Sequence, residues 1–279
     1  MKRLHRAAYL VILLFFTFSL TTQSLAQDKT EFTDLRDALF SGRQLSGGSG
    51  PSNVVWINNG EQYSYTQFDA ETRASQIRSY DPISGKDELI FVNTNFKTPG
   101  TDQTFQYNSF QWTSDSRFIV FQSNFRPVYR NSGVSDYYYF EVESQQLKVL
   151  VKDAMTAELS PDGSKVGYER DGDLFVYDLS KGTETQLTHS GKENFYNGRF
   201  GWVYEEEFGM VQAWRWSHDS KYIAYWQTDE RDVKRFVSTD YSGTYPEYVE
   251  IPYPKVGAKN PSIKMGAVNI ENGKNAWMN

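Results

Sequence analysis

A pattern of strand, tight turn and strand recurs four times along this chain. In each copy, apolar and aromatic residues flank an Asn-Gly, Asp-Ser or Asp-Gly pair, and such pairs favour tight chain reversals. The four copies occupy residues 55–65, 110–121, 158–168 and 214–225. Asp115 and Asp162 are 47 residues apart, and Asp162 and Asp219 are 57 residues apart. This period indicates a repeat architecture in which each unit is long enough for four short strands.

A second hairpin pattern follows each of the first three copies. Two hairpins per repeat predict a four-stranded antiparallel blade, and the apolar alternation predicts one buried face for each strand. The predicted fold class is therefore all-β, with β-propeller blades of four antiparallel strands over residues 51–279. An open β-sandwich is the alternative. Four blades are the fewest that propellers normally use, so we do not expect this chain to close a ring by itself.

Composition agrees with this fold class and excludes several functions. Aromatic residues make up 16% and charged residues 23% of the chain, a balance typical of pleated strands. A net charge of −6 argues against nucleic acid as a partner. The chain has no cysteine, and its three histidines include His5 in the leader, which leaves only His189 and His218 for a zinc site. We therefore expect no metal and no cofactor.

The first residues have the layout of a targeting signal. Basic residues precede an apolar run over residues 7–20, and a Ser-Leu-Ala tripeptide ends at Ala26. This layout predicts a secretory signal peptide over residues 1–26, cleaved after Ala26. The alternative is an uncleaved membrane anchor, but the apolar run is shorter than the roughly 20 residues that a bilayer requires. We expect an exported protein, periplasmic or secreted, in which residues 27–50 form a lead-in to the propeller.

An insertion over residues 191–208 separates the third repeat from the fourth. It carries three adjacent carboxylates, Glu205, Glu206 and Glu207, among aromatic residues. We expect a short helix here, on which neighbouring positions diverge by about 100°, so that only some of these side chains point the same way. Two carboxylates beside aromatic walls suit an ammonium ligand, because they accept its charge-assisted hydrogen bonds. The alternative is a solvated helical face that binds nothing.

Several motifs in and after this insertion are specific enough to compare with a known family. They are Gly-Lys-Glu at 191–193, Tyr-Asn-Gly at 196–198, Trp-Val-Tyr-Glu-Glu-Glu at 202–207 and Tyr-Pro-Lys-Val-Gly-Ala-Lys-Asn-Pro at 253–261. Together they resemble the N-terminal domain of the dipeptidyl peptidase IV family, within the prolyl oligopeptidase group of serine peptidases. The resemblance covers essentially the whole chain after residue 26, most weakly before residue 105.

The resemblance implies a fold and an activity. The family's N-terminal domain is an eight-bladed propeller, of which this chain would supply about four blades, with a short helical insertion that carries the glutamates. That propeller caps an α/β-hydrolase domain, and the enzyme releases dipeptides from peptide N-termini, with Pro or Ala preferred in second position. The implied partners are free peptide N-termini and the C-terminal hydrolase domain. Because members of the family often dimerise, a second copy of the full-length protein is a further candidate partner.

The resemblance also implies roles for particular residues. Glu206 and Glu207 match the family's glutamate pair, which would bind the free α-ammonium group of the substrate, whereas the role of Glu205 beside them is undefined. Arg130, in the run Tyr-Arg-Asn-Ser, matches an arginine that contacts a substrate carbonyl oxygen and braces the glutamates. Arg126 is the alternative to Arg130, and an ordinary ion pair at a strand edge is the competing interpretation of Arg130 itself.

The sequence contains no residues that suggest hydrolysis by this chain alone. An α/β-hydrolase places its serine on a Gly-x-Ser-x-Gly turn, and no such pentapeptide occurs. The nearest match, residues 47–50, is followed by Pro51, while His189 and His218 fall at a blade end and in a hairpin turn. We therefore expect a fragment of a longer polypeptide that lacks the catalytic domain and is inactive by itself.

Three functional hypotheses follow. The leading one is the substrate-recognising part of an exported serine-type dipeptidyl peptidase. The second is a non-catalytic periplasmic propeller that binds peptide or protein, as TolB-like repeats do, since Ser-Pro-Asp-Gly at 160–163 is common there. The third is a catalytically dead member of the peptidase family. The first differs from the second in requiring Glu206 and Glu207 to converge with Arg130.

Overall fold

The structure is a computed structural model of the chain, and it describes residues 32–40 and 50–278. The chain divides into two units, residues 1–50 and 51–279, each of which is described by itself. The predicted signal peptide and residues 47–49 lie outside the described residues. The division into signal peptide, lead-in and propeller therefore stays a prediction.

The described part of the first unit contains helix α2 (Leu35–Phe40). The Asp34 carboxylate accepts a hydrogen bond from the Asp37 N–H at 2.8 Å, and the Asp37 carboxylate accepts one from the Thr33 N–H at 3.1 Å. Such reciprocal bonds satisfy N–H groups that have no partner within the helix.

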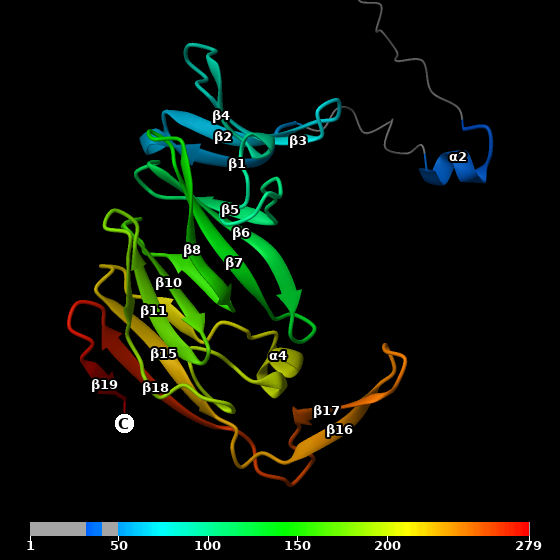
Figure 1. Cartoon of the computed structure of the whole chain (residues 1–279), viewed down its shortest axis with the longest axis vertical. Coiled ribbons are helices and arrows are strands. Elements are labelled where there is room, and N and C mark those ends of the chain that lie inside the picture. The colour runs from blue at the N-terminus through cyan, green and yellow to red at the C-terminus, as the bar shows by residue number, and fades with distance from the viewer. Residues whose placement is uncertain (1–31, 41–49, 279) are drawn as a thin grey trace, which may run out of the picture. The chain divides into compact units, whose positions relative to one another are not determined.

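Antiparallel sheets account for most of the second unit, as Figure 1 shows. Blade 1 comprises β1 (Ser52–Ile57), β2 (Gln62–Asp69), β3 (Ala74–Tyr80) and β4 (Asp87–Val92). Blade 2 comprises β5 (Ser109–Trp112), β6 (Phe118–Pro127), β7 (Gly133–Glu141) and β8 (Gln146–Ala154). Blade 3 comprises β9 (Thr156–Leu159), β10 (Lys165–Arg170), β11 (Asp173–Asp178) and β12 (Thr183–Gln186). Each of these blades has four strands in sequence order, which confirms the predicted fold class.

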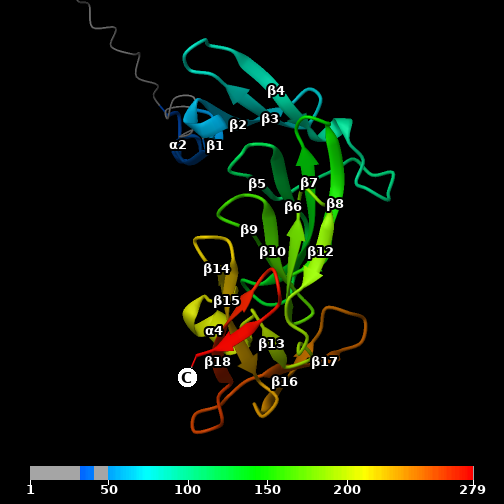
Figure 2. The same cartoon turned by 90° about the vertical axis from the view of Figure 1, so that its left-hand side faces the viewer.

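Blade 4 is less regular. Its strands are β13 (Phe195–Asn197), β14 (Trp214–Trp216), β15 (Tyr222–Asp229), β18 (Ser262–Asn269) and β19 (Asn275–Trp277). Both β13 and β14 pair with β15, at opposite ends of that strand. Between β15 and β18 the chain makes a separate hairpin of β16 (Arg235–Asp240) and β17 (Glu247–Pro252), which the sequence analysis missed. In Figure 2 this hairpin stands apart from the blades.

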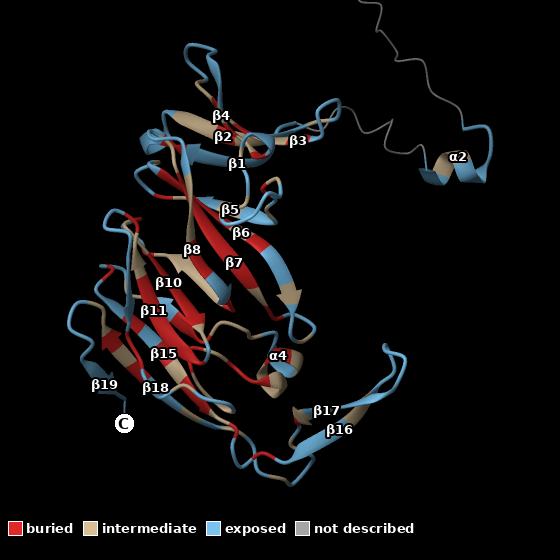
Figure 3. Ribbon diagram, viewed as in Figure 1, coloured by how far each residue is buried: buried red, intermediate tan, exposed pale blue. Residues whose placement is uncertain are grey.

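The blades pack against one another through side chains that alternate along their central strands. Phe118 of β6 lies in a buried cluster with Tyr168 of blade 3, whereas its neighbour Ile119 lies in a cluster with Phe91 of blade 1. Both faces of the first half of β6 are therefore buried, and Figure 3 shows β7, β10 and β11 as largely buried strands, whereas the end of β6 is exposed. The expectation of one buried face per strand is wrong for the central strands of blades 2 and 3, because each of these blades has a neighbouring blade on both sides.

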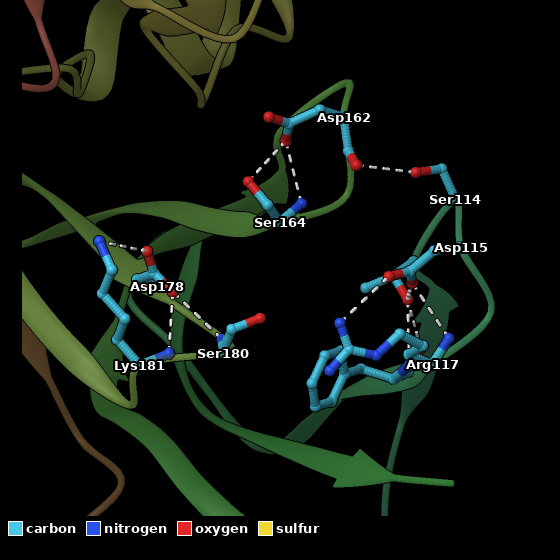
Figure 4. Close-up of polar contacts among 10 residues, drawn as sticks. Ser114, Asp115, Arg117, Asp162, Ser164, Asp178, Ser180 and Lys181 are labelled. Atoms are coloured by element: carbon cyan, nitrogen blue, oxygen red, sulfur yellow. Dashed lines mark hydrogen bonds and ion pairs between the residues drawn. The ribbon is translucent and has the colours of Figure 1, made fainter. Parts of the chain in front are cut away.

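The repeated turns contact one another from blade to blade. The Asn58 N–H of blade 1 donates to the Ser116 hydroxyl of blade 2 at 2.8 Å. The Ser114 hydroxyl of blade 2 donates to the Asp162 carbonyl oxygen of blade 3 at 2.9 Å, as Figure 4 shows. The Asp162 N–H then donates to the Ser220 hydroxyl of blade 4 at 3.1 Å. The turn residues that reverse the chain thus also join adjacent blades.

The helical elements within residues 50–278 are short. They are the 3₁₀ turns η1 (Asn58–Gly60) and η2 (Asn93–Asn95) and helix α4 (Trp202–Phe208). No helix among the described residues is long and apolar enough to cross a membrane.

Candidate functional site

A buried carboxylate anchors the segment that leads from blade 3 to blade 4. Asp173 Oδ1 accepts hydrogen bonds from the Thr188 hydroxyl at 2.7 Å, the Gly191 N–H at 3.1 Å and the Asn197 side-chain amide at 2.9 Å. The Gln227 side-chain amide donates in turn to Asn197 Oδ1 at 2.8 Å. Because buried polar groups are costly without partners, this network fixes the path of the segment. Gly191 and Asn197, two residues of the sequence motifs, are therefore anchoring residues.

Helix α4 follows this segment and rests on aromatic rings. Tyr204 stacks on Phe200 with ring centroids 5.1 Å apart, and Phe200 meets Trp226 of β15 edge to face at 4.8 Å. Each such pair stabilises the packing by about 0.5–1.5 kcal/mol beyond the burial of its area. The helix ends at Gly209, whose positive φ of 64° is a left-handed conformation that glycine adopts without steric cost. The sequence thus holds a helix of two turns against blade 4.

The Glu205 carboxylate joins α4 to the turn between β6 and β7. Its Oε1 accepts hydrogen bonds from the backbone N–H groups of Asn131 at 2.6 Å and Ser132 at 3.0 Å. Glu205 is only 3% exposed, so water does not compete strongly for these bonds. Glu205 therefore clamps residues 128–132 of blade 2 to the helix, and Figure 1 shows α4 beside the tip of the β6–β7 hairpin.

This clamp places Arg130 beside Glu206. Arg130 Nε lies 3.5 Å from Glu206 Oε2, with the arginine side chain 77% exposed and the glutamate side chain 16% exposed. Glu207 is exposed, and its carboxylate forms no hydrogen bond or ion pair with any residue that the structure describes. The three adjacent carboxylates thus occupy three different environments, as the helix geometry predicted. Arg130 and Glu206 thus lie side by side, and the next residue along the helix, Glu207, retains unused acceptor positions.

Arg126, the alternative to Arg130, belongs to a different cluster. Its Nη2 lies 3.1 Å from Asp136 Oδ1 and also contacts the Asp153 carboxylate. Asn124 donates to the second Asp136 oxygen at 3.0 Å. Since these contacts occupy the guanidinium within blade 2, the structure brings Arg130, and not Arg126, to Glu206.

Comparison with known proteins shows the family of the chain. Residues 113–279 match the sequence profile described as the dipeptidyl peptidase IV (DPP IV) N-terminal region, which is more than half of the chain. The chain belongs to the dipeptidyl peptidase IV family. Dipeptidyl peptidase 4 of Sus scrofa is 30% identical over 224 residues, which are 77% of this chain and 28% of that protein. Dipeptidyl peptidase 4 of Trichophyton tonsurans is 29% identical over 231 residues, again 28% of its length.

A solved structure also matches this chain. The crystal structure of Porphyromonas gingivalis dipeptidyl peptidase 4 matches with a TM-score of 0.69 at 26% identity, over 90% of this chain and 35% of that one. The chain therefore spans about a third or less of the length of the dipeptidyl peptidase 4 relatives it matches.

A second group of charged residues lies next to the start of helix α4, where Glu230 is close to Gly201. The Arg199 guanidinium lies over the Tyr196 ring, 3.8 Å from its centroid. Burial raises the pKa of Glu169 to about 7, and the Arg199 charge opposes this rise without cancelling it. Burial likewise raises the pKa of Glu230 to about 7, again against Arg199. Burial, followed by the nearby Tyr196 and Glu230, also raises the pKa of Tyr129, which precedes Arg130 in the clamped turn.

Neither these residues nor the clamp could be recognised from the sequence. Glu230 stands in the charge-rich run 229–232, which is typical of a solvated turn, and nothing local marks Arg199 as half-buried. The only signal for Glu205 was its place in the triplet, where helix geometry required one side chain to point away from its neighbours. Among the described residues, no group of three or more His, Cys, Asp or Glu side chains has the arrangement of a metal site.

Proposed function

We propose that this chain is the part of an exported serine-type dipeptidyl peptidase that recognises the free N-terminus of a peptide. Glu206 and Glu207 bind the α-ammonium group, and Arg130 contacts a carbonyl oxygen of the substrate. The catalytic serine, aspartate and histidine come from a C-terminal α/β-hydrolase domain, which releases X-Pro or X-Ala dipeptides. The observation that carries this proposal is the 3.5 Å approach of Arg130 to Glu206 from a different blade.

The electrostatics of the site support recognition of an amine. Arg130 offsets part of the charge on Glu206, while Glu207 keeps all of its acceptor positions for a ligand. An ammonium group satisfies both carboxylates with charge-assisted hydrogen bonds. An acylated amine has no charge to offset the desolvation of two carboxylates, so selectivity for free N-termini follows from the same arrangement.

Glu206→Gln in the full-length protein tests this role, because glutamine keeps the size of the side chain and removes its charge. We expect kcat/KM on chromogenic X-Pro amides to fall about 10- to 100-fold, the range for losing one hydrogen bond between charged groups. The matched control is Glu143→Gln, which changes an exposed glutamate between β7 and β8 and should leave kcat/KM unchanged. Near-normal kcat/KM in Glu206→Gln contradicts the assignment of Glu206.

The alternative is the non-catalytic periplasmic propeller that binds peptide or protein. Such a scaffold has no need for Arg130 to meet Glu206, so their contact favours the peptidase. An immunoblot of the source cells with an antibody to residues 27–279 separates the two hypotheses. A band much larger than this chain supports the peptidase, whereas a band of the size of residues 27–279 supports the scaffold.

Export is tested by amino-terminal sequencing of the native protein. We propose that residues 1–26 are removed, so the first residue found should be Gln27. A native protein that keeps residues 1–26 supports the uncleaved membrane anchor instead.

A further inference from the structure

Glu230 lies directly against the residue that precedes helix α4. It is 3% exposed, and its backbone is fixed by a hydrogen bond from its own N–H to the Asn194 carbonyl oxygen at 2.8 Å. A Cβ atom added to Gly201 would lie 1.5 Å from Glu230 Oε1 and 2.5 Å from Oε2. The carboxylate therefore occupies the space that any side chain at position 201 would need. Glu230 Oε1 has no hydrogen-bond partner among the described residues, so hydrogen bonding does not account for its position.

Charged and titratable groups surround this carboxylate. The positive charges of Arg199 and Arg235 both attract it. The negative charge of Glu230 in turn contributes to the raised pKa of Tyr129 in the clamped turn. The two arginines come from different elements, Arg199 from the segment before α4 and Arg235 from β16. Attraction from these positions offsets part of the cost of burying the carboxylate, although burial still raises the pKa of Glu230.

A short series of contacts leads from Glu230 to Arg130. The Gly201 carbonyl oxygen accepts the N–H of Glu205 at 3.3 Å, which begins the helical hydrogen bonding of α4. Glu205 in turn accepts the N–H groups of Asn131 and Ser132. A shift of Gly201 therefore moves the carboxylate that clamps the arginine turn.

We propose that Glu230 is a positioning residue for the amine-binding site: its buried carboxylate fixes Gly201, and through Gly201 it fixes α4 and the turn that carries Arg130. This inference rests on the proposed function for its effect on substrates, while its effect on the clamp is independent of that function. Glu230 itself touches no substrate.

The first test measures kinetics on two substrates with the full-length protein. One is an Ala-Pro chromogenic amide, and the other is the same compound without the amino group. For Glu230→Ala we expect KM for the amine substrate to rise about tenfold, with kcat and the desamino substrate little changed. Glu230→Gln, which keeps the shape against Gly201, should stay within about twofold of the wild type. Equal losses on both substrates, or no change in Glu230→Ala, would overturn the proposal.

Gly201→Ala tests the same contact from the other side. The φ of −90° and ψ of −177° at this position suit alanine, so the new methyl group acts only by displacing the Glu230 carboxylate. We expect it to reproduce the KM change of Glu230→Ala. In the double variant the methyl group enters space that Glu230 has vacated, so the two effects should not multiply. A Gly201→Ala variant with wild-type KM, or fully multiplicative effects, contradicts the proposal.

Hydrogen exchange of the full-length protein provides a readout that does not depend on activity. The Asn131 and Ser132 amides should exchange at least about tenfold faster in Glu230→Ala and Gly201→Ala than in the wild type or Glu230→Gln. Unchanged protection of these amides refutes the positioning role. If protection falls as expected but the wild type shows no preference for a free amine, the proposed function fails and the positioning role stands.

Discussion

Glu169 allows a quantitative test of how burial changes the protonation of a carboxyl group near Arg199. Its side chain is fully buried in β10, and its Oε1 accepts the Gly172 N–H at 2.6 Å. Its second oxygen has no hydrogen-bond partner among the described residues. Burial raises the pKa of this carboxyl from its ordinary value of 4.5 to about 7, although Arg199 opposes the rise. The native protein therefore holds this proton more tightly than the unfolded chain does.

The sign and size of the effect follow from this difference. Each pKa unit corresponds to about 1.36 kcal/mol, so the shift corresponds to roughly 3 kcal/mol. Because the native state binds more protons than the unfolded state over this interval, the free energy of unfolding falls as pH rises from about 4.5 through about 7 and then levels off. Glu169→Gln cannot titrate and keeps the acceptor for Gly172. The stability of the variant relative to the wild type should therefore increase by roughly 2–3 kcal/mol between about pH 5 and pH 8.

Urea unfolding followed by tryptophan fluorescence at several pH values measures this difference. The control is Glu184→Gln on β12 of the same blade. Burial acts to raise the pKa of Glu184, but hydrogen bonds from Arg170 and Tyr168 outweigh it and lower the pKa. The relative stability of that variant should therefore stay constant above about pH 5. A constant difference for Glu169→Gln as well, or one that falls with rising pH, refutes the reasoning.

Three further predictions concern stability and are measured by urea unfolding at neutral pH. Glu205→Ala should lower the free energy of unfolding by roughly 2–3 kcal/mol because two backbone N–H groups lose their charged acceptor, whereas the exposed Glu207→Ala should change it by less than about 0.5 kcal/mol. Equal effects of the two changes would contradict the clamp. Phe121→Ala, which empties a site between blades 1 and 2, should cost about 3–5 kcal/mol, while the exposed Phe68→Ala should cost almost nothing. Ser220→Ala should cost about 1 kcal/mol by removing the acceptor that joins blades 3 and 4, and no loss would show that this contact does not hold the turns together.

Much of the fold could be predicted from residues close together in the sequence. The Asp162 and Asp219 turns predicted hairpins because turn geometry depends on a few adjacent residues. The hairpin of β16 and β17 could not be predicted in this way, because it interrupts blade 4 and follows no repeat. The burial of both faces of β6 also depended on neighbours from other blades.

The sequence by itself determined the four-stranded repeat, the position of the glutamate helix and the divergence of Glu205, Glu206 and Glu207 around it. These properties are local, since strand alternation and the helical angle are fixed by a few consecutive residues. Only the tertiary structure decided that Glu205 accepts the N–H groups of the Arg130 turn and that Glu230 is buried against Gly201. Those contacts join residues far apart in the chain, so whether each carboxylate meets an arginine, an amide or water depends on how the blades pack.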